Sequence, residues 1–539
     1  MNQHVAMQLP APTPGPLTRS GLGFHTATRL WMKADAPEFG YSDGTAVENG
    51  LLESLRSCRD VSICSSELPT HIKDWPTLYH FSSSRANVLR PIATKLSGAR
   101  VLEIGAGCGA ITRFLGESAE EVVAVEGSPR RALITRERTR DLDNVHVVAA
   151  NMQDVNLEEA SFDVVTLIGV LEYARLFVVG ANPFQALLEQ ARRHLKPDGI
   201  LVVAIENKLG LKYLSGAPED HVGRPYVGVE DRYTDQTART FGAVELKSLL
   251  SQSGFGNTQL MGSFPDYKVP FCIVSESGAK HSVFDPTPII QRAVSRDPQY
   301  PKAKGFDHVK AWRSAASNHL SIDLANSFIA IAHAGTDSFE FDLAYHYATE
   351  RRAAHRKQVR FIDRGNAIVV KHEHLYPSPS PIYQIPEETP YYKGSSIAEH
   401  FATLLEEPNL RVQHLIRFFD DYTQAVSRIV GASGLAHAED IDGQFLDLSC
   451  ENLIRSHDNE LHPIDLEWIS ETPIPLARLI FRSVYWLLDK NISPLQESLG
   501  TTMHQRDLAI TILSGIFPSA SQTDIMTYCH EELTFFQRT

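Results

Sequence analysis

A glycine-rich turn and two acidic residues could together bind a nucleotide-like ligand. Residues 100–104 form a short apolar segment that runs directly into the glycine-rich stretch GAGCG at 105–109. Glycines let the backbone turn tightly and pass close to a ligand, and the helix that follows offers free N–H groups. Glu126 ends the next apolar segment, where a carboxylate can accept hydrogen bonds from both hydroxyls of a ribose. The pattern predicts a site for a ligand that contains a ribose.

Two kinds of ligand fit this turn. Gly105, Gly107 and Ala110 satisfy the Gly-x-Gly-x-x-Ala form of nicotinamide dinucleotide sites, and Glu126 serves that interpretation equally well. Glu103, two residues before the first glycine, could instead hold the amino-acid end of a ligand. A polar cluster at 151–154 follows the third apolar segment, where an adenine edge would lie. These additions favour a ligand that carries both an adenosine and an amino acid.

Five segments resemble, in order and spacing, the successive motifs of class I S-adenosylmethionine-dependent methyltransferases. They are VLEIGAGCGAITRFL (101–115), VVAVEGSPRRA (122–132), NMQD (151–154), FDVVTLIGVLEY (162–173) and LKPDGILVVAIEN (195–207). The resemblance covers about residues 85–275. It implies that the methionine and ribose parts of S-adenosylmethionine are lined by Glu103, Gly105, Gly107 and Gly109. It also implies that Glu126 binds the ribose hydroxyls, that Gln153 or Asp154 contacts the adenine, and that the sulfonium lies above Gly169.

The methyl acceptor is not fixed by these motifs. Residues 206–213 and 219–225 follow the fifth apolar segment, at the edge where open α/β sheets bind substrates. His221 could act as general base for a hydroxyl, and Lys208 or Arg224 could hold a phosphate or carboxylate. The alternative is that all three are solvated loop charges.

A second set of chemistry-bearing residues lies near the C-terminus. Asp447 and Asn452 occur in FLDLSCEN (445–452), and Asp465 occurs in PIDLEW (463–468). This spacing matches kinase catalytic loops, in which Asp447 would accept the proton of the attacking hydroxyl while Asn452 and Asp465 would hold Mg²⁺ against the phosphates of ATP. Upstream, Lys371 ends the segment IVVK, which resembles the strand whose lysine pairs the α- and β-phosphates.

The C-terminal segment departs from protein kinases, because Phe445-Leu446 replaces His-Arg, Asp465-Leu466-Glu467 replaces Asp-Phe-Gly, and no glycine-rich loop precedes Lys371. The form IDLEW is closer to small-molecule kinases of the aminoglycoside or choline type. A methyltransferase followed by such a module resembles the bifunctional methyltransferase–kinase proteins of bacterial surface-polysaccharide synthesis. That resemblance implies O-methylation of a sugar or sugar-phosphate, with phosphorylation of a glycan or small molecule. A C-terminal half that only binds or scaffolds remains an alternative, and a nicotinamide-dependent oxidoreductase is a weaker one.

The elements that must position these residues alternate in type. Apolar segments at 100–104, 122–126, 145–150, 162–168 and 200–205 predict strands, and 85–96, 128–142 and 183–195 predict helices. Strands separated by helix-length segments form parallel βαβ units, so we expect a Rossmann-like doubly wound α/β sheet. Residues 259–262 and 271–275 could complete it. Strand-like residues 327–333 and 367–371 followed by a helical stretch predict a separate α+β kinase-like domain.

These patterns divide the chain into five parts. We expect a disordered lead at 1–20, an N-terminal segment at 21–84 that could form a lid, the methyltransferase domain at 85–276, a proline-containing linker at 277–310, and the kinase-like domain at 311–539.

Composition narrows the partners and the compartment. Lys and Arg number 51 against 65 Asp and Glu, and the net charge of −14 argues against a broad nucleic-acid face. No apolar run reaches the roughly 18 residues that a membrane-spanning helix needs. The six cysteines are scattered with no Cys-x-x-Cys pair, which fits a reducing cytoplasm. We expect a cytoplasmic protein that acts on a small-molecule or glycan acceptor; the oligomeric state is left open.

Overall fold

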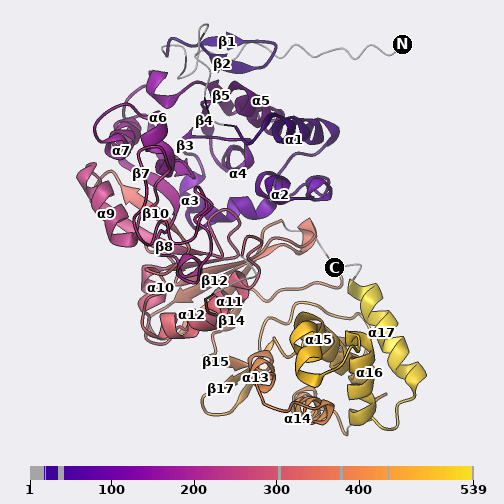
Figure 1. Cartoon of the computed structure of the whole chain (residues 1–539). Helices are drawn as coiled ribbons and strands as arrows, with labels where there is room; N and C mark the ends of the chain where they lie inside the picture. Colours follow the sequence, from indigo (N-terminus) through magenta and orange to yellow (C-terminus); the bar gives the residue numbers. More distant parts are fainter. Residues whose placement is uncertain are drawn as a thin grey trace, which may run out of the picture. The chain divides into compact units, whose positions relative to one another are not determined.

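The chain divides into two compact units in the computed structural model (Figure 1). Unit 1 comprises Met1–His281 and Ile289–Glu350, and unit 2 comprises Ser282–Pro288 and Arg351–Thr539. The structure describes residues 17, 20–33, 40, 42–300, 305–376, 380–434 and 436–536. The disordered lead expected at 1–20 therefore lies outside the described residues, except for Leu17 and Ser20.

Unit 1 is built on a mixed sheet with the strand order β1-β2-β5-β4-β3-β6-β7-β10-β8-β9-β11. The strands from β2 to β7 in this order run parallel to their neighbours, and β10 runs antiparallel to both β7 and β8. The strands are β1 Gly23–His25, β2 Leu30–Met32, β3 Arg100–Ile104, β4 Glu121–Glu126, β5 Val145–Ala149, β6 Phe162–Ile168, β7 Leu195–Glu206, β8 Asn257–Phe264, β9 Cys272–Ser275, β10 Ser327–His333 and β11 Ala344–Ala348.

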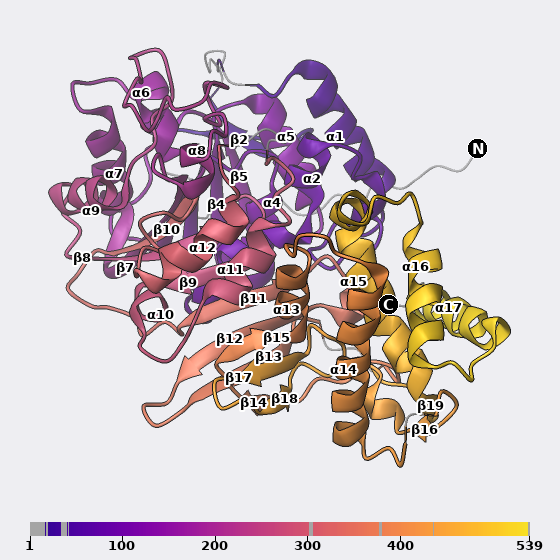
Figure 2. The same ribbon diagram turned by 60° about the horizontal axis from the view of Figure 1, so that its bottom comes forward.

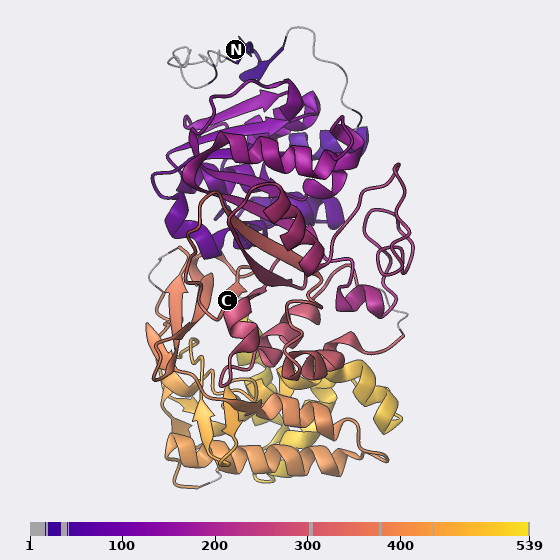
Figure 3. The same cartoon turned by 90° about the vertical axis from the view of Figure 1, so that its left-hand side faces the viewer.

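Helices cover both faces of the parallel part of this sheet. Figure 1 shows α1, α4 and α5 on one side of β3–β5 and α7 and α9 on the other, and Figure 3 shows helices beside the strands in this part of the chain from a second direction. The helices of unit 1 are α1 Thr45–Ser57, α2 Trp75–Phe81, α3 Ala93–Leu96, α4 Ala110–Ser118, α5 Pro129–Arg138, α6 Ala174–Phe177, α7 Pro183–His194, α8 Leu211–Leu214, α9 Ala243–Gln252, α10 Glu276–Lys280 and α12 His308–Ser317, with α11 Thr287–Val294 crossing the unit boundary.

Local sequence explains where the expected helices hold and where they do not. The Ser128 side chain accepts a hydrogen bond from the Arg131 N–H and Pro129 occupies the first turn, so α5 begins where the sequence predicts. The single helix expected at 85–96 is wrong. Two short 3₁₀ helices precede α3 there, because Pro91 lacks the N–H that a continuous helix would use.

The boundary between the units differs from the one expected at 277–310. That stretch contains α10 and α11, and the next strand, β10, belongs to the sheet of unit 1 instead of to a second domain. All seven residues of β10 are buried, since β7 and β8 pair with it on both sides along its full length. The prolines of residues 277–310 predict a linker. Only the long-range pairing with β7 and β8 shows that β10, the strand that follows, belongs to the sheet of unit 1.

Unit 2 combines short antiparallel strands with a group of helices (Figure 2). Its strands pair in the orders β12-β13-β14, β15-β17-β18 and β16-β19. The elements are β12 Lys357–Asp363, β13 Ile368–His374, β14 Glu388–Pro390, β15 Gly394–Ser396, β16 Asp440–Ile441, β17 Leu453–Ser456, β18 Leu461–Pro463, β19 Ile474–Pro475, α13 Ile397–Leu404, α14 Val412–Val430, α15 Leu476–Leu499, α16 Gln505–Ile516 and α17 Gln522–Phe536.

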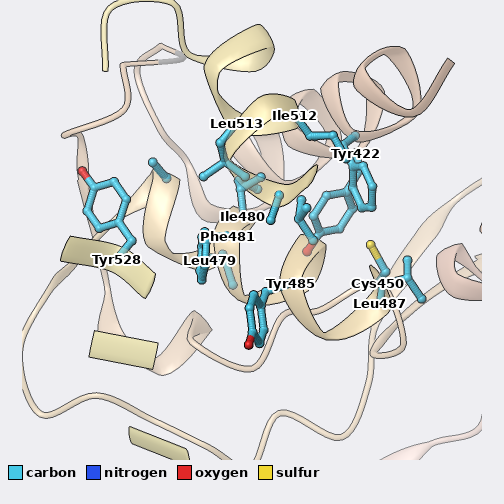
Figure 4. Close-up of a cluster of buried hydrophobic side chains, with 14 of the residues drawn as sticks. Tyr422, Cys450, Leu479, Ile480, Phe481, Tyr485, Leu487, Ile512, Leu513 and Tyr528 are labelled. Atoms are coloured by element: carbon cyan, nitrogen blue, oxygen red, sulfur yellow. The ribbon is translucent and has the colours of Figure 1, made fainter. Parts of the chain in front are cut away.

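The core of unit 2 forms around α15. Leu479, Ile480 and Phe481 of this helix are fully buried and pack with Ile512 and Leu513 of α16 (Figure 4). The arrangement is α+β, as the sequence predicts. Within the described ranges of the whole chain, no helix combines the length and apolarity needed to cross a bilayer.

Candidate functional site

A cavity of about 430 Å³ opens in unit 1 at the carboxyl ends of β3, β4 and β6. This is the edge where ligands bind in open α/β sheets. Six of the residues predicted from the sequence line it together: Glu103, Gly105, Gly107, Glu126, Gly169 and His221.

Three glycines keep the cavity open because a side chain at each would fill it or strain the turn. Gly105, Gly107 and Gly169 all have positive φ, at 80°, 59° and 71°. A Cβ on Gly105 would clash with Val170, and one on Gly169 would lie 2.6 Å from the Tyr267 hydroxyl. Backbone, not side chain, therefore faces the ligand at these three positions.

Gly109 does not line the cavity. It is the left-handed residue before α4, where a Cβ would lie 2.9 Å from the Thr135 Cα of α5. Its place in the motif reflects the close packing of α4 against α5.

Glu126 lies at the end of β4 with its carboxylate held by two backbone amides. Oε2 accepts from the Gly107 N–H at 2.8 Å, and Oε1 accepts from the Ser128 N–H at 2.9 Å. Burial raises the pKa of Glu126, although nearby Arg131 and the two amides act against it. The carboxylate thus lines the cavity in a fixed orientation.

Glu103, one residue before the end of β3, is 3% exposed. Burial raises its pKa to about 7, and the charge of Glu126 adds to the effect. Its Oε2 atom has no hydrogen-bond partner within the described residues. A buried carboxyl oxygen that faces a cavity without a partner is a ready acceptor for a ligand's ammonium or hydroxyl group.

Gln153 and Asp154 lie outside the cavity lining, exposed on the turn Met152–Asp154. Their neighbours Asn151 and Met152 line it instead. The Asn151 side chain accepts from the Gln153 N–H at 3.2 Å, and in the turn that this cap begins the side chains of Gln153 and Asp154 face outward.

The N-terminal segment supplies lining residues that the sequence did not single out as ligand contacts. Trp75 and Tyr79 of α2 border the cavity, together with Arg85. The Arg85 guanidinium lies 4.1 Å from the Tyr79 ring centroid and donates to the Lys268 carbonyl at 2.7 Å. No local motif marks Arg85, so only the folded chain brings it to the site. The lid role expected for 21–84 stays a prediction.

His221 enters the cavity with both ring nitrogens engaged. Nε2 lies 3.3 Å from Glu206 Oε2, and Nδ1 lies 3.0 Å from the Tyr173 hydroxyl. Burial lowers its pKa, but the Glu206 carboxylate outweighs burial and raises the value to about 9. An imidazolium has no lone pair, so this arrangement does not support the predicted role of His221 as a base at neutral pH.

The two cations considered for the acceptor lie elsewhere. Lys208 is paired with Glu245 at 2.9 Å and with Asp231 at 3.4 Å, and neither it nor the exposed Arg224 lines the cavity. The solvated-charge interpretation fits Arg224.

In unit 2, the structure brings Asp447, Asn452 and Asp465 together. The Asn452 side-chain amide donates to the carbonyl of Asp447 at 2.9 Å and to that of Asp465 at 3.4 Å. Asp465 has φ of 55°, a left-handed conformation that non-glycine residues adopt infrequently. Burial raises the pKa of Asp447 to about 7, while Lys357 outweighs burial and lowers that of Asp465 to about 2.

Lys371 is not the lysine nearest to these residues. Its Nζ pairs with Glu373 at 3.0 Å, whereas the neighbouring His372 faces Asp465 at 3.5 Å. Lys357 of β12, 1% exposed, pairs with Asp465 and with Glu467 Oε2 at 2.6 Å. Alternation along β13 places Lys371 on the face opposite His372, away from Asp465.

The chain is similar to known methyltransferases. Residues 102–201 match the family model described as a methyltransferase domain. Ribosomal RNA small subunit methyltransferase A of Streptococcus sanguinis (strain SK36) is 49% identical over 59 residues, 11% of this chain and 20% of that protein. Demethylmenaquinone methyltransferase of Tropheryma whipplei (strain Twist) is 28% identical over 172 residues, 30% of this chain and 68% of that protein.

The chain thus spans about a fifth of the first relative's length and about two thirds of the second's. A solved structure from Thermotoga maritima, described as a SAM-dependent methyltransferase and possible histamine N-methyltransferase, is 19% identical with a TM-score of 0.28, covering 48% of this chain and 91% of that one. Residues 102–201 of unit 1, which lie on its mixed α/β sheet, thus match the model of a methyltransferase domain.

Proposed function

We propose that unit 1 transfers a methyl group from S-adenosylmethionine to a hydroxyl group of a sugar. The observation that carries this proposal is the cavity in which Gly105, Glu126 and Gly169 meet at the carboxyl edge of the sheet. The aromatic side chains of Trp75 and Tyr79 border the same cavity, which suits a ring-shaped polar acceptor.

The residues present fit the methyl donor. Glu126 would accept the ribose hydroxyls, and the unpartnered Oε2 of Glu103 would accept from the amino group. Arg85, buried in the lining, would pair with the carboxylate of the donor. Gly169 would present only backbone to the donor, because the Tyr267 hydroxyl leaves no room for a side chain there. Gln153 and Asp154, on the exposed turn, support a contact to the adenine less well than Asn151 does.

The donor supplies an activated methyl group, so the chain has two tasks. It must hold the acceptor oxygen in line with the methyl carbon, and it must take up the proton that the hydroxyl loses. Glu126, fixed by its two amide contacts, would hold the ribose of the donor and so help to keep the methyl carbon in line with the acceptor oxygen.

Charge and cysteine chemistry support the partners and compartment that we propose. The net charge of −14 fits a small-molecule or glycan acceptor better than a nucleic acid. All six cysteines are free, which fits a reducing cytoplasm.

Thermal unfolding with candidate ligands tests the donor. S-adenosylmethionine or S-adenosylhomocysteine should raise the unfolding temperature, whereas a nicotinamide dinucleotide should not. Stabilisation by the dinucleotide alone would replace the methyltransferase with the oxidoreductase alternative.

For unit 2 we propose a phosphotransferase of the small-molecule kinase type, supported by the convergence of Asp447, Asn452 and Asp465. Asn452 and Asp465 would hold Mg²⁺, and Lys357 takes the place that the sequence suggested for Lys371. ATP with Mg²⁺ should stabilise wild type and the exposed-turn control Asp458→Ala, but not Asp465→Ala. If ATP affects none of the three proteins, the alternative of a binding or scaffold module replaces the kinase.

A further inference from the structure

Glu172 is a buried carboxyl group in the cavity wall that the fold leaves unused. It lies in the short 3₁₀ helix Leu171–Tyr173, directly beyond Gly169 and Val170. Its side chain is fully buried and lines the cavity, and neither carboxyl oxygen has a hydrogen-bond partner within the described parts of the chain. A buried acceptor without a partner costs stability, so a ligand that completes it gains binding energy.

The charged groups that face Glu172 are already committed to another carboxylate. These groups are Glu206 of β7, His221 and Lys268. Lys268 pairs with Glu206 Oε1 at 2.5 Å, and His221 approaches Glu206 Oε2 at 3.3 Å. Both cations therefore pair with Glu206, and neither forms an ion pair with Glu172. Burial and the charge of Glu206 raise the pKa of Glu172 to about 8, so its carboxylate is available as a base only as the pH approaches that value.

The surrounding wall is unsuited to an anionic acceptor. Glu172 and Asp220 line the cavity, and Asp220 and Asp266 hold the buried Lys212 behind it at 3.6 and 3.2 Å. Lys212, Lys268 and His221 are thus each paired with a buried carboxylate. A phosphate or carboxylate would have to break such a pair before it gained a partner.

We propose that Glu172 contacts the methyl acceptor and accepts its proton, and that the acceptor group is an uncharged hydroxyl instead of a phosphate or carboxylate oxygen. This assignment rests on the function proposed for unit 1. The hydroxyl oxygen forms a bond to the methyl carbon, the carbon–sulfur bond of the donor breaks with its electron pair left on sulfur, and the hydroxyl proton passes to the Glu172 carboxylate. His221, paired with Glu206, is left to position the acceptor.

Infrared spectroscopy tests the assignment without an acceptor. The difference spectrum between pH 6 and pH 10 should contain the carbonyl stretch of a protonated carboxylic acid that is lost in Glu172→Gln. The control Glu189→Gln changes an exposed glutamate of α7 and should retain the full signal. A spectrum that Glu172→Gln leaves unchanged would overturn the proposal.

Calorimetry separates this proposal from the proposed function. S-adenosylhomocysteine should bind wild type and Glu172→Gln with affinities within about threefold of each other, because Glu172 contacts the acceptor and not the donor. Loss of binding in the variant alone would assign Glu172 to the donor site and overturn its acceptor role. Absence of binding to wild type would count against the function proposed for unit 1 itself.

Transfer of label from S-adenosylmethionine to three probes tests the acceptor class. Methyl glucoside is neutral, glucosamine is cationic and glucose 6-phosphate carries an anion. We expect label on the hydroxyls of the neutral probe. The rate should rise up to about pH 8 and should be at least 100-fold lower in Glu172→Gln. Label found only on the phosphate group would contradict the proposed acceptor class. Loss of activity on addition of a metal chelator would show that a metal held by Glu172, Glu206 and His221, and not proton transfer to Glu172, supports the reaction.

Discussion

Two carboxyl groups of each candidate site are held in opposite ways. In unit 1, Glu103 and Glu172 are buried beside a cavity with oxygens that find no partner in the described chain. In unit 2, Asp465 and Glu467 are also enclosed, but Lys357 and Arg351 pair with them directly. The pKa values differ accordingly, raised to about 7 for Glu103 and about 8 for Glu172, and lowered to about 2 for Asp465.

This difference shows what each arrangement is suited to do. Carboxyl groups that lack partners weaken the empty protein and gain from a ligand, so the cavity of unit 1 is prepared for binding. Carboxylates paired with internal cations contribute to the fold as it stands, and a ligand must compete for them. Substitutions should therefore destabilise unit 2 where they remove a cation and stabilise unit 1 where they remove a carboxylate.

The largest expected effect comes from Lys357→Met in unit 2. It leaves Asp465 and Glu467 without their shared cation, and removal of one partner of a buried ion pair costs about 3–5 kcal/mol. Urea unfolding of the full chain, monitored by a spectroscopic signal from unit 2, measures this loss in the free energy of unfolding.

Lys371→Met on the neighbouring strand is the matched control. The Lys371 side chain is 28% exposed and pairs with Glu373, so its loss should cost less than about 1 kcal/mol. Equal losses for the two variants would contradict the claim that Lys357 holds the carboxylates of unit 2.

Glu103→Gln should have the opposite sign and depend on pH. Because burial raises its folded pKa to about 7, ionised Glu103 destabilises the fold most fully above pH 7, and this penalty fades as the pH falls towards the unfolded value. The variant should be more stable than wild type by roughly 1–3 kcal/mol at pH 8 and nearly equal to it at pH 5.

Asp465→Asn gives the contrast within the same measurement. Its folded pKa is depressed to about 2, so its carboxylate contributes stability above the unfolded pKa that is lost as the pH falls through about 2. This variant should be less stable than wild type at pH 8. Similar pH profiles for the two variants would remove the contrast between the sites.

The smallest effect is expected from Tyr173→Phe. The change removes the hydroxyl that lies 3.0 Å from His221 Nδ1 but leaves the pairing of His221 with Glu206 intact. A loss of about 0.5–1.5 kcal/mol should follow, with a small shift in the His221 titration measured by NMR. A histidine signal that titrates identically in both proteins would show that this hydrogen bond does not form.

Contiguous motifs made much of unit 1 predictable. Glu103 and Glu126 lie at the carboxyl ends of β3 and β4, and Gly105 and Gly107 follow β3, so sheet geometry alone brings them to one edge. The same reasoning placed Gly109, Gln153 and Asp154 at the ligand, whereas the cavity is lined by Asn151 and Met152 and Gly109 lies where α4 packs against α5. Which side chains of 151–154 face the cavity depends on the local turn that Asn151 caps.

The remaining features depend on contacts between distant parts of the sequence. The sequence of residues 327–333 predicts a strand, but only the pairing of this strand, β10, with β7 and β8 assigns it to unit 1. Lys357 and Lys371 lie on adjacent strands, and only alternation and register decide which one reaches Asp465. Glu172 stood inside a recognised motif, but nothing local indicates that its carboxyl group lacks a partner.

Calorimetric titration of S-adenosylmethionine into wild type and Glu126→Ala tests the central claim most directly. Loss of a charged acceptor for the ribose hydroxyls should cost about 1.5–3 kcal/mol, roughly 10- to 150-fold in affinity. Circular dichroism controls for the loss of the two amide contacts that Glu126 makes within the fold. Binding to wild type that weakens in this range is the predicted result. No binding to wild type, or equal binding to both proteins, would contradict the account of the cavity as the methyl-donor site.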